Sequence, residues 1–291
     1  MNKLFLSLSL LLFSTFSFGW WNTGHATVCQ IAENHLTPEV KAEVDRLLGN
    51  KSFAESCNWP DYVRPNRDNT FPWHYVNIPK SKLKVEASDC PPESCVLEAI
   101  QMHIRLLRNK KLPDIDRAES LMFLGHFVGD VHQPLHVGEK EDKGGSGHEV
   151  NIDQATQNAL NYQGYNEWLK LNKLQVHQLA LREPKYPPHI KKSNMHSIWD
   201  GAVLQHKLIK DDIAWYDYAD QLAKRKPTIL LGNPVMWAQE SKDVLGLHSF
   251  GYNVEIENID AEYLEHHLPI VEQRLVLAGY RLATILNQII L

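Results

Sequence analysis

Apolar residues recur every three or four positions along most of this chain, the spacing that places them on one face of an α-helix. The pattern predicts helices over residues 22–36, 37–49, 94–109, 116–133, 193–209, 233–247 and 260–291. Thr37 and Pro38 supply an N-cap and a first-turn proline for the second of these helices, and Gly49 ends it. Pro134 ends the helix over residues 116–133.

Polar and apolar residues do not alternate convincingly in any segment, so the pattern predicts no sheet. Residues 49–94 and 137–160 read as loops, and the second contains the glycine-rich and charged sequence KEDKGGSG. The sequence shows no internal repeat, no low-complexity tract and no interdomain linker. We therefore expect a single, mostly α-helical domain.

The first 19 residues have the form of a secretory leader. Lys3 gives the short positive region, Leu4–Phe13 the apolar run, and Ser17–Gly19 a small-x-small cleavage site. The apolar run is too short to span a bilayer, and no later stretch is apolar enough, so no membrane protein is predicted. We expect residues 1–19 to be a signal peptide and residues 20–291 to form the mature domain, secreted or periplasmic.

The chain carries a formal net charge of −5. Proteins that grip nucleic acid along many phosphates are usually basic. Any nucleic-acid role is therefore expected at a local site rather than along an extended groove. The 15 histidines are a high number for 291 residues and favour a bound metal.

The four cysteines behind a leader favour two disulfides. Cys90 and Cys95 flank a Pro-Pro turn, and elimination then pairs Cys29 with Cys57. Four cysteines allow three pairings, so this one is an expectation. A zinc site of four thiolates is the alternative, but Cys29 and Cys57 lack the close-paired spacing of such sites.

Two histidine–aspartate pairs occur at the i,i+4 spacing of one helix face. His126 pairs with Asp130, and His196 pairs with Asp200, while His136 lies just beyond the first pair. Such a pair can hold a cation from one rigid element, although a single pair is more often a surface pair or a helix cap. Together the pairs indicate a metal site, and nitrogen and oxygen ligands suit zinc, with manganese, nickel and iron as alternatives.

Asp61 and His74 lie in sequence rich in Trp and Pro and are further candidate ligands. An Asp after a Pro is usually a turn residue, and a His between aromatics usually packs in a core, so both readings stay open. His132 is expected to point away from the ligands. His148 and His189 are expected to be structural or surface residues.

The motifs together resemble those of one family. They are WWNTGH, WPDYVR, HYVN, HFVGDVHQPLH, GGSGHEV, HSIWD, WAQES and AGYRLATILN, and their order and approximate spacing match along most of the chain. The chain is thus similar to the zinc-dependent, single-strand-specific nucleases of the S1/P1 type. The resemblance implies a catalytic domain over residues 20–291 with a mostly helical fold, related to that of zinc phospholipase C, and a site for three zinc ions.

The resemblance implies a ligand set for each zinc ion. The first ion takes Asp61, His74, His126 and Asp130; the second takes His25, Asp130 and the α-amine and carbonyl oxygen of Trp20; the third takes His136, His196 and Asp200. The amine and carbonyl of one residue form a five-membered chelate, and an α-amine with a pKa of about 7.7–8.0 gives up its proton to zinc near neutral pH. This ligand requires cleavage between Gly19 and Trp20, and the indole is expected to pack nearby.

The resemblance also implies the chemistry. Three zinc ions would attract phosphate, activate a bridging hydroxide and stabilise the leaving 3′ oxygen. Asp61 would orient the water, and Arg64 would neutralise charge in the transition state. Tyr75 would stack on a base and Asn77 would hydrogen-bond to its edge, so a paired base does not fit. The expected substrates are single-stranded DNA, RNA and 3′-nucleotides, cleaved to 5′-phosphate products by a monomer.

Some positions depart from the family pattern. Asn77 stands where fungal relatives tend to carry an acid, and Ser146 stands in place of the Asn of the family's Gly-Gly-Asn. The segment Asn151–Lys192 is longer than expected, and we favour a packed helical hairpin there over an aromatic lid.

Two other functions remain open on the sequence. One is a phosphodiesterase of the zinc phospholipase C type, which would act at a lipid surface. The other is a non-catalytic protein that only binds zinc and needs the ligands but not Arg64.

Overall fold

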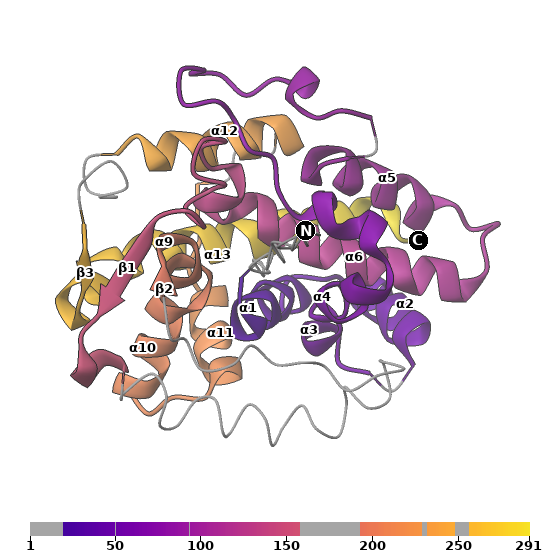
Figure 1. Cartoon of the computed structure of the whole chain (residues 1–291). Helices are drawn as coiled ribbons and strands as arrows, with labels where there is room; N and C mark the ends of the chain where they lie inside the picture. The colour runs from indigo at the N-terminus through magenta and orange to yellow at the C-terminus, as the bar shows by residue number, and fades with distance from the viewer. Residues whose placement is uncertain (1–19, 50, 93, 158–192, 229–231, 248–255) are drawn as a thin grey trace, which may run out of the picture.

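The computed structural model describes residues 20–49, 51–92, 94–157, 193–228, 232–247 and 256–291. These residues form one body built almost entirely of helices (Figure 1). The longer helices are α1 (Asn22–Glu33), α2 (Pro38–Leu48), α5 (Val96–Arg108), α6 (Asp114–His132), α10 (Val203–Lys210), α11 (Trp215–Ala223), α12 (Pro234–Leu245) and α13 (Ala261–Ile289). The mostly α-helical prediction is confirmed. The leader, residues 1–19, lies wholly outside the described residues, and so do residues 158–192 of the expected helical hairpin.

Helix starts follow the caps that the sequence offers. The Thr37 side chain accepts a hydrogen bond from the Val40 amide at the start of α2, and Asn233 caps α12 in the same way. Asp260 caps the long final helix α13. These local signals explain why the periodic segments could be placed closely from the sequence.

The expectation of loops over residues 49–94 was wrong in part. Short helices lie there: α3 (Phe53–Ser56), α4 (Trp59–Val63), η1 (Arg64–Asn66), η2 (Asp68–His74) and η3 (Ala87–Asp89). Ser52 starts α3 by accepting a hydrogen bond from the Glu55 amide. Each helix is only one or two turns long, too short to show a period in the sequence.

Helix α6 forms the centre of the fold. It packs against α1, α5, α12 and α13, so most of its length is buried. Two glycines allow this close packing, because a Cβ atom on Gly125 would lie 2.5 Å from Cys57 Sγ, and one on Gly129 would lie 3.0 Å from His25 Nδ1. The helix therefore carries its polar residues into the core.

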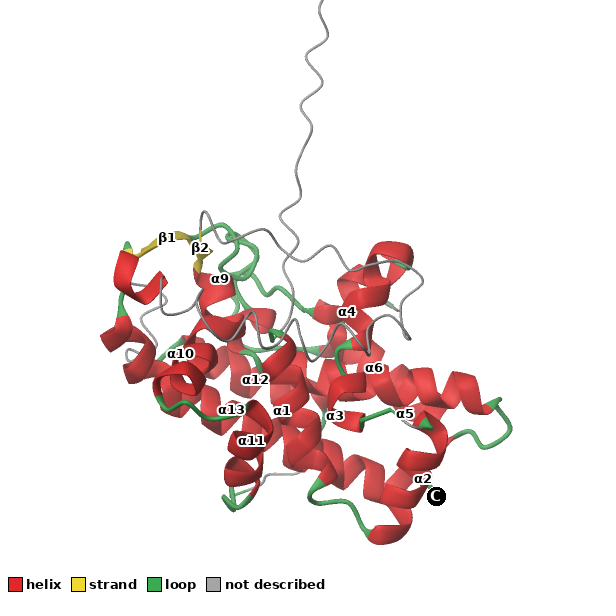
Figure 2. Ribbon diagram, turned by 90° about the horizontal axis from the view of Figure 1, so that it is seen from below, coloured by secondary structure: helices red, strands yellow, loops and turns green. Residues whose placement is uncertain are grey.

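A small sheet was not predicted. It has the order β2 (Ser193–Asn194), β1 (Glu149–Ile152), β3 (Asn258–Ile259), and β1 pairs antiparallel with β2 and parallel with β3. Figure 2 shows β1 and β2 at one side of the helical body, beside α9 (Met195–Ser197). The sheet thus fixes the backbone where α9 begins.

Beyond α9 the chain continues through one π-helical turn, η5 (Ile198–Ala202), into α10. A Cβ atom on Gly201 in this turn would lie only 2.0 Å from Cδ2 of Trp21. The Trp21 amide also donates to the Asp200 carbonyl at 2.7 Å. The glycine therefore lets the first described residues pack directly on the turn.

Two disulfides join Cys29 to Cys57 and Cys90 to Cys95, as predicted. The first links α1 to the end of α3, and the second closes the turn before α5. None of the described helices combines the length and apolar character needed to cross a bilayer.

Candidate metal centre

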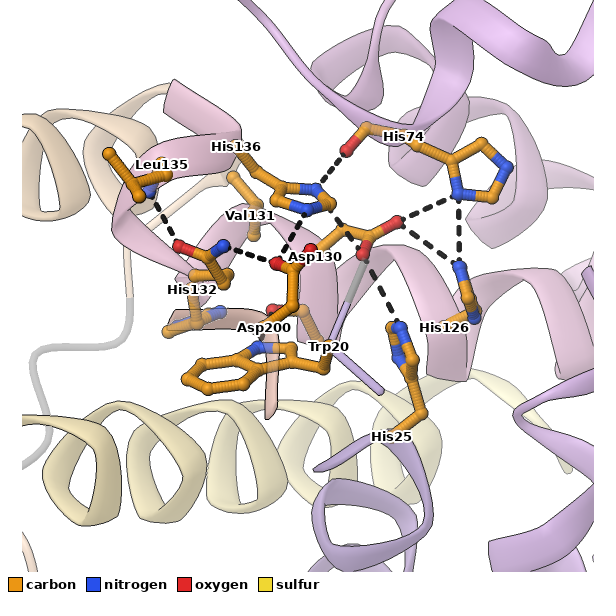
Figure 3. Close-up of polar contacts among 12 residues, drawn as sticks. Trp20, His25, His74, His126, Asp130, Val131, His132, Leu135, His136 and Asp200 are labelled. Carbon is orange, nitrogen blue, oxygen red and sulfur yellow. Dashed lines mark hydrogen bonds and ion pairs between the residues drawn. The ribbon is translucent and has the colours of Figure 1, made fainter. Parts of the chain in front are cut away.

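Eight of the nine predicted ligand residues converge on one buried centre. Figure 3 shows six of them, which are His25, His74, His126, Asp130, His136 and Asp200. They group as His25, Asp61 and His126; as His74, His126 and Asp130; and as His136, His196 and Asp200, and within each group the ligand atoms lie within 4.8 Å of one another. Helix α6 supplies His126 and Asp130 one turn apart, as the i,i+4 spacing predicts. The 3₁₀ helix η4 (Pro134–Val137) supplies His136 directly after it.

Asp130 lies at the middle of these groups. Its Oδ2 is 3.1 Å from His74 Nδ1 and 3.3 Å from His126 Nε2. Its Oδ1 is 3.5 Å from His25 Nε2 and 3.3 Å from His136 Nδ1. The two oxygens of one carboxylate thus face different histidines, an arrangement that can bridge two cations.

Asp61 and His25 complete this side of the centre. Asp61 Oδ1 lies 3.8 Å from His126 Nε2 and 3.7 Å from His74 Nδ1. The His25 ring stacks on the His126 ring with 3.7 Å between centroids. Helices α1, α4 and α6 therefore bring their side chains to the same point.

The third group lies on the other side of Asp130. His196 Nε2 is 3.3 Å from Asp200 Oδ2, and His136 Nε2 is 3.5 Å from Asp200 Oδ1. The π-helical turn carries Asp200, so the predicted i,i+4 pair is formed although the backbone is not a regular α-helix.

Backbone carbonyls set the orientation of three histidine rings. The Nδ1 atoms of His126, His136 and His196 donate to the carbonyls of Cys57, His74 and Gly144 at 2.8, 2.7 and 2.5 Å. With Nδ1 committed to a carbonyl in each ring, Nε2 is the nitrogen directed at the centre. Histidines that bind metal commonly donate their other ring nitrogen in this way.

Several buried ligand atoms have no hydrogen-bond partner among the described residues. They are His25 Nε2, Asp61 Oδ1, Asp130 Oδ1, His136 Nε2 and His196 Nε2. Leaving such atoms unpaired in a core is costly, whereas a cation in each ligand group would satisfy them. The residues present therefore fit metal ions, and their nitrogen and oxygen donors suit zinc.

The electrostatics agree with this fit. Burial lowers the pKa of His25 well below its usual range and lowers that of His74 to about 4. Burial alone would raise the pKa of Asp130, but His126 and His136 outweigh it and hold that pKa well below normal. Burial raises the pKa of Asp200 well above normal, because it disfavours the charged carboxylate.

The amino-acid sequence also matches a known protein family. A family model described as S1/P1 Nuclease matches residues 20–161 and 186–291. The chain belongs to the S1/P1 nuclease family. Relatives include Endonuclease 2 of Arabidopsis thaliana, 27% identical with 93% of this chain and 90% of that protein covered, and Nuclease S1 of Aspergillus oryzae, 25% identical with 98% and 96% covered. Nuclease P1 of Penicillium citrinum is 30% identical over 126 residues, which is 40% of this chain and 47% of that protein.

In this S1/P1 family member, Arg64 lies beside the centre. It is only 4% exposed, and its Nη1 is 3.5 Å from Asp61 Oδ1. Its guanidinium also lies over the Phe71 ring at 5.2 Å. Burial would raise the pKa of Asp61, but His126 and Arg64 outweigh it and lower that pKa.

Tyr75 and Asn77 follow His74 and are partly exposed. Tyr75 meets the Phe71 ring edge-on at 6.0 Å. Asn77 Oδ1 lies 3.2 Å from the point where a Cβ atom on Gly144 would be, and Gly144 has a left-handed φ of +64°. Tyr75 thus lies beside Phe71, and Asn77 lies beside Gly144, whose carbonyl accepts the hydrogen bond from His196.

Trp20 is fully buried, and its indole Nε1 donates to the Gly129 carbonyl at 2.9 Å. The indole thus packs beside the centre, as predicted (Figure 3). His132 points away from the ligands, as predicted, and donates from Nδ1 to the Val128 carbonyl.

Sequence reasoning missed Gln133. Its amide nitrogen donates to Asp200 Oδ1 at 2.5 Å, and its amide oxygen accepts from the Leu135 amide at 2.6 Å. One end of this fully buried side chain thus holds the Asp200 carboxylate, and the other end is fixed by the backbone of η4. Only its place between the ligands Asp130 and His136 could have drawn attention to it.

Proposed function

We propose that this S1/P1 family member is a secreted, zinc-dependent endonuclease that cleaves single-stranded DNA and RNA to 5′-phosphate products. We further propose that it removes phosphate from 3′-nucleotides and acts as a monomer with three zinc ions. The observation that supports this most is the set of three adjoining histidine–aspartate groups joined through Asp130. Family membership supports the reaction class, which is hydrolysis of phosphodiester bonds.

The ligand assignment follows the groups described above. Asp61, His74, His126 and Asp130 would hold one zinc ion; His25, Asp130 and the Trp20 main chain a second; and His136, His196 and Asp200 a third. Zinc supplies Lewis acidity and lowers the pKa of water, which is the chemistry a neutral-pH phosphodiesterase needs. The eight ligand residues are at most 5% exposed, and burial strengthens the electrostatic interactions at the site.

Arg64 and Asp61 act as a pair in this proposal. The Asp61 carboxylate accepts a hydrogen bond from the water that attacks the phosphate. The Arg64 guanidinium, held near Asp61 and Phe71, offers a planar set of donors that matches phosphate oxygens. Its fixed position means that it stabilises developing negative charge without having to reorganise.

The preference for single strands rests on Tyr75 and Asn77. A base that enters the open side of the centre can stack on the Tyr75 ring and hydrogen-bond to the Asn77 amide. A base in a duplex can reach these groups only after it has unpaired and unstacked, which costs a few kcal/mol. Unpaired substrates are therefore favoured.

Maturation is part of the proposal, with residues 1–19 as the signal peptide and residues 20–291 as the catalytic domain. If the Trp20 α-amine is a ligand, one extra residue before Trp20 removes it. That longer chain should lose one zinc ion and most activity, measured by metal analysis and by cleavage of single-stranded DNA. Full activity would show that the amine does not bind metal.

The central experiment offers single-stranded DNA, RNA, a 3′-nucleotide and phosphatidylcholine side by side. We expect cleavage of the first three and none of the lipid. Hydrolysis of lipid alone would replace the nuclease by a phospholipase. Three bound zinc ions without any cleavage would indicate a protein that only binds zinc.

Arg64→Ala tests the role of the arginine. We expect unchanged zinc content and a fall in turnover of about 100-fold or more, the range seen when a transition-state donor is removed. Arg105→Ala is the matched control, because Arg105 is exposed on α5. Equal turnover in the two variants would remove Arg64 from the mechanism.

A further inference from the structure

The last carbonyls of α6 need donors from outside the helix, because the last turn of a helix has no intrahelical partners for them. Ser241 Oγ on α12 donates to the Val131 carbonyl at 2.5 Å. Arg274 Nε on α13 donates to the His132 carbonyl at 2.9 Å. These two carbonyls lie between the candidate ligands Asp130 and His136 in the chain. Residues far away in sequence thus hold the backbone that carries both ligands.

The two donors belong to a larger buried cluster. Arg274 Nη2 donates to Ser241 Oγ at 2.7 Å, and Arg274 Nη1 lies 3.3 Å from Glu240 Oε2. Arg281 reaches both oxygens of Glu240 at 2.7 Å and also donates to His132 Nε2 at 2.7 Å. We call Glu240, Ser241, Arg274 and Arg281 the α12–α13 clamp. It fixes the His132 side chain as well as the backbone.

The clamp also accounts for two family motifs that the ligand groups leave unexplained. The sequence WAQES supplies Glu240 and Ser241, and AGYRLATILN supplies Arg281. The Trp237 ring in the first motif lies under the Arg281 guanidinium at 5.5 Å. Neither motif contributes a residue to the candidate metal centre.

Stability alone is a poor explanation for such a cluster. Arg274 and Arg281 are each only 2% exposed, and burying guanidinium groups carries a large desolvation cost. Apolar residues of similar volume often give equal or greater stability, whereas buried charged groups can fix one arrangement of the backbone. Metal ligands need such fixing to within about 0.5 Å.

We propose that the α12–α13 clamp positions the end of α6 so that Asp130 and His136 are preformed for metal binding. The proposal rests on the metal centre described above but not on the substrate. None of the clamp residues belongs to the three ligand groups; they act through the Val131 and His132 carbonyls and the His132 ring.

Arg274→Leu tests the proposal, and Arg117→Leu is its matched control. Arg117 is likewise buried on α6, donates from Nε to the helix-end carbonyl of Leu107 at 3.1 Å and pairs with Glu43 at 2.8 Å. It lies near the other end of α6 and contacts none of the ligand groups. Both variants remove a buried arginine, a carbonyl cap and an ion pair, so they separate positioning from general stability.

The measurement is the number of zinc ions retained after dialysis against increasing EDTA, at a temperature where circular dichroism shows every variant folded. For Arg274→Leu we expect zinc release at EDTA concentrations about 10- to 100-fold lower than for the unaltered chain, as for groups that orient metal ligands. For Arg117→Leu we expect a change of less than about threefold. Equal zinc retention in the two variants would overturn the proposal.

Ser241→Ala gives a second, milder test if Arg274→Leu does not fold. It deletes one hydroxyl group and introduces no new volume. We expect zinc release at a lower EDTA concentration than for the unaltered chain, and unchanged retention would also overturn the proposal. Because the readout is bound zinc, a failure of the proposed nuclease activity would leave this result unaffected.

Discussion

His103 should make the stability of the protein depend on pH independently of the metal centre. Its side chain on α5 is 4% exposed, and neither ring nitrogen has a hydrogen-bond partner among the described residues. The ring stacks on Phe123 with 4.7 Å between centroids and meets Trp73 edge-on at 5.8 Å. Burial in this aromatic setting lowers the pKa of His103 to about 3.

The direction of the effect follows from proton linkage. In the folded chain His103 stays neutral down to about pH 3, whereas in the unfolded chain it takes up a proton near its ordinary pKa of 6.5. The contribution of neutral His103 to the free energy of unfolding is therefore fully present above pH 6.5 and is lost as the pH falls from 6.5 towards 3. With these two pKa values, lowering the pH from 7 to 5 costs about 2 kcal/mol.

His103→Leu removes the titrating group and keeps a similar volume. We expect urea unfolding to show that the unaltered chain loses about 2 kcal/mol more than the variant between pH 7 and pH 5. At pH 7 the variant should be at least as stable, because it removes two buried nitrogens without partners.

Equal losses in His103→Leu and the unaltered chain would refute this reasoning. The ligand histidines also titrate, but they are present in both chains, so their contribution cancels in the difference. A larger loss in the variant would mean that His103 gains a proton and a partner on acidification, contrary to its apolar surroundings.

Three further changes have defined outcomes. Gly201→Ala places a Cβ atom 2.0 Å from Trp21 Cδ2 and should lower the free energy of unfolding by about 1–3 kcal/mol, so an unchanged urea midpoint would contradict the packing described. Gln133→Met deletes the donor to Asp200 and should weaken zinc binding by about 10- to 100-fold in a chelator titration, whereas unchanged affinity would show that this hydrogen bond is dispensable. Removing the metals with EDTA should lower the thermal midpoint of unfolding reversibly. A bound ion stabilises the fold by about 2.7 kcal/mol when its free concentration is about 100 times its dissociation constant. A midpoint insensitive to EDTA and to added zinc would argue against a structural metal centre.

The sequence predicted the features that depend on local spacing. The i,i+4 pairs of His126 with Asp130 and of His196 with Asp200 follow from helix geometry, and the structure places each pair at 3.3 Å. Helix α2 could be placed from Thr37 at its start, because a cap acts within a few residues. The resemblance supplied Asp61, His74 and His25, which spacing alone did not connect.

What the sequence could not show depends on contacts between distant segments. The carbonyl acceptors for the ligand histidines are backbone groups, and every residue has one, so no residue type marks Cys57 or Gly144 for this role. Strands of two residues, as in β2 and β3, carry no alternating pattern. The clamp on α6 joins residues more than 100 positions apart, such as Val131 and Ser241. The roles of Arg64, Tyr75 and Asn77 stay predictions.

The Cys29–Cys57 bridge lies directly behind the metal centre. His126 donates its orienting hydrogen bond to the Cys57 carbonyl, and Cys29 lies one helical turn after His25. A Cβ atom on Gly125 would meet both sulfurs, so the bridge packs against the helix that carries His126. A chain reduced at this bridge would keep every ligand residue. It would lose the link between α1, which carries His25, and Cys57, whose carbonyl orients His126. A reduced chain is therefore expected to hold its metal-ligand residues less firmly, and to take up metal less readily, than the oxidised chain.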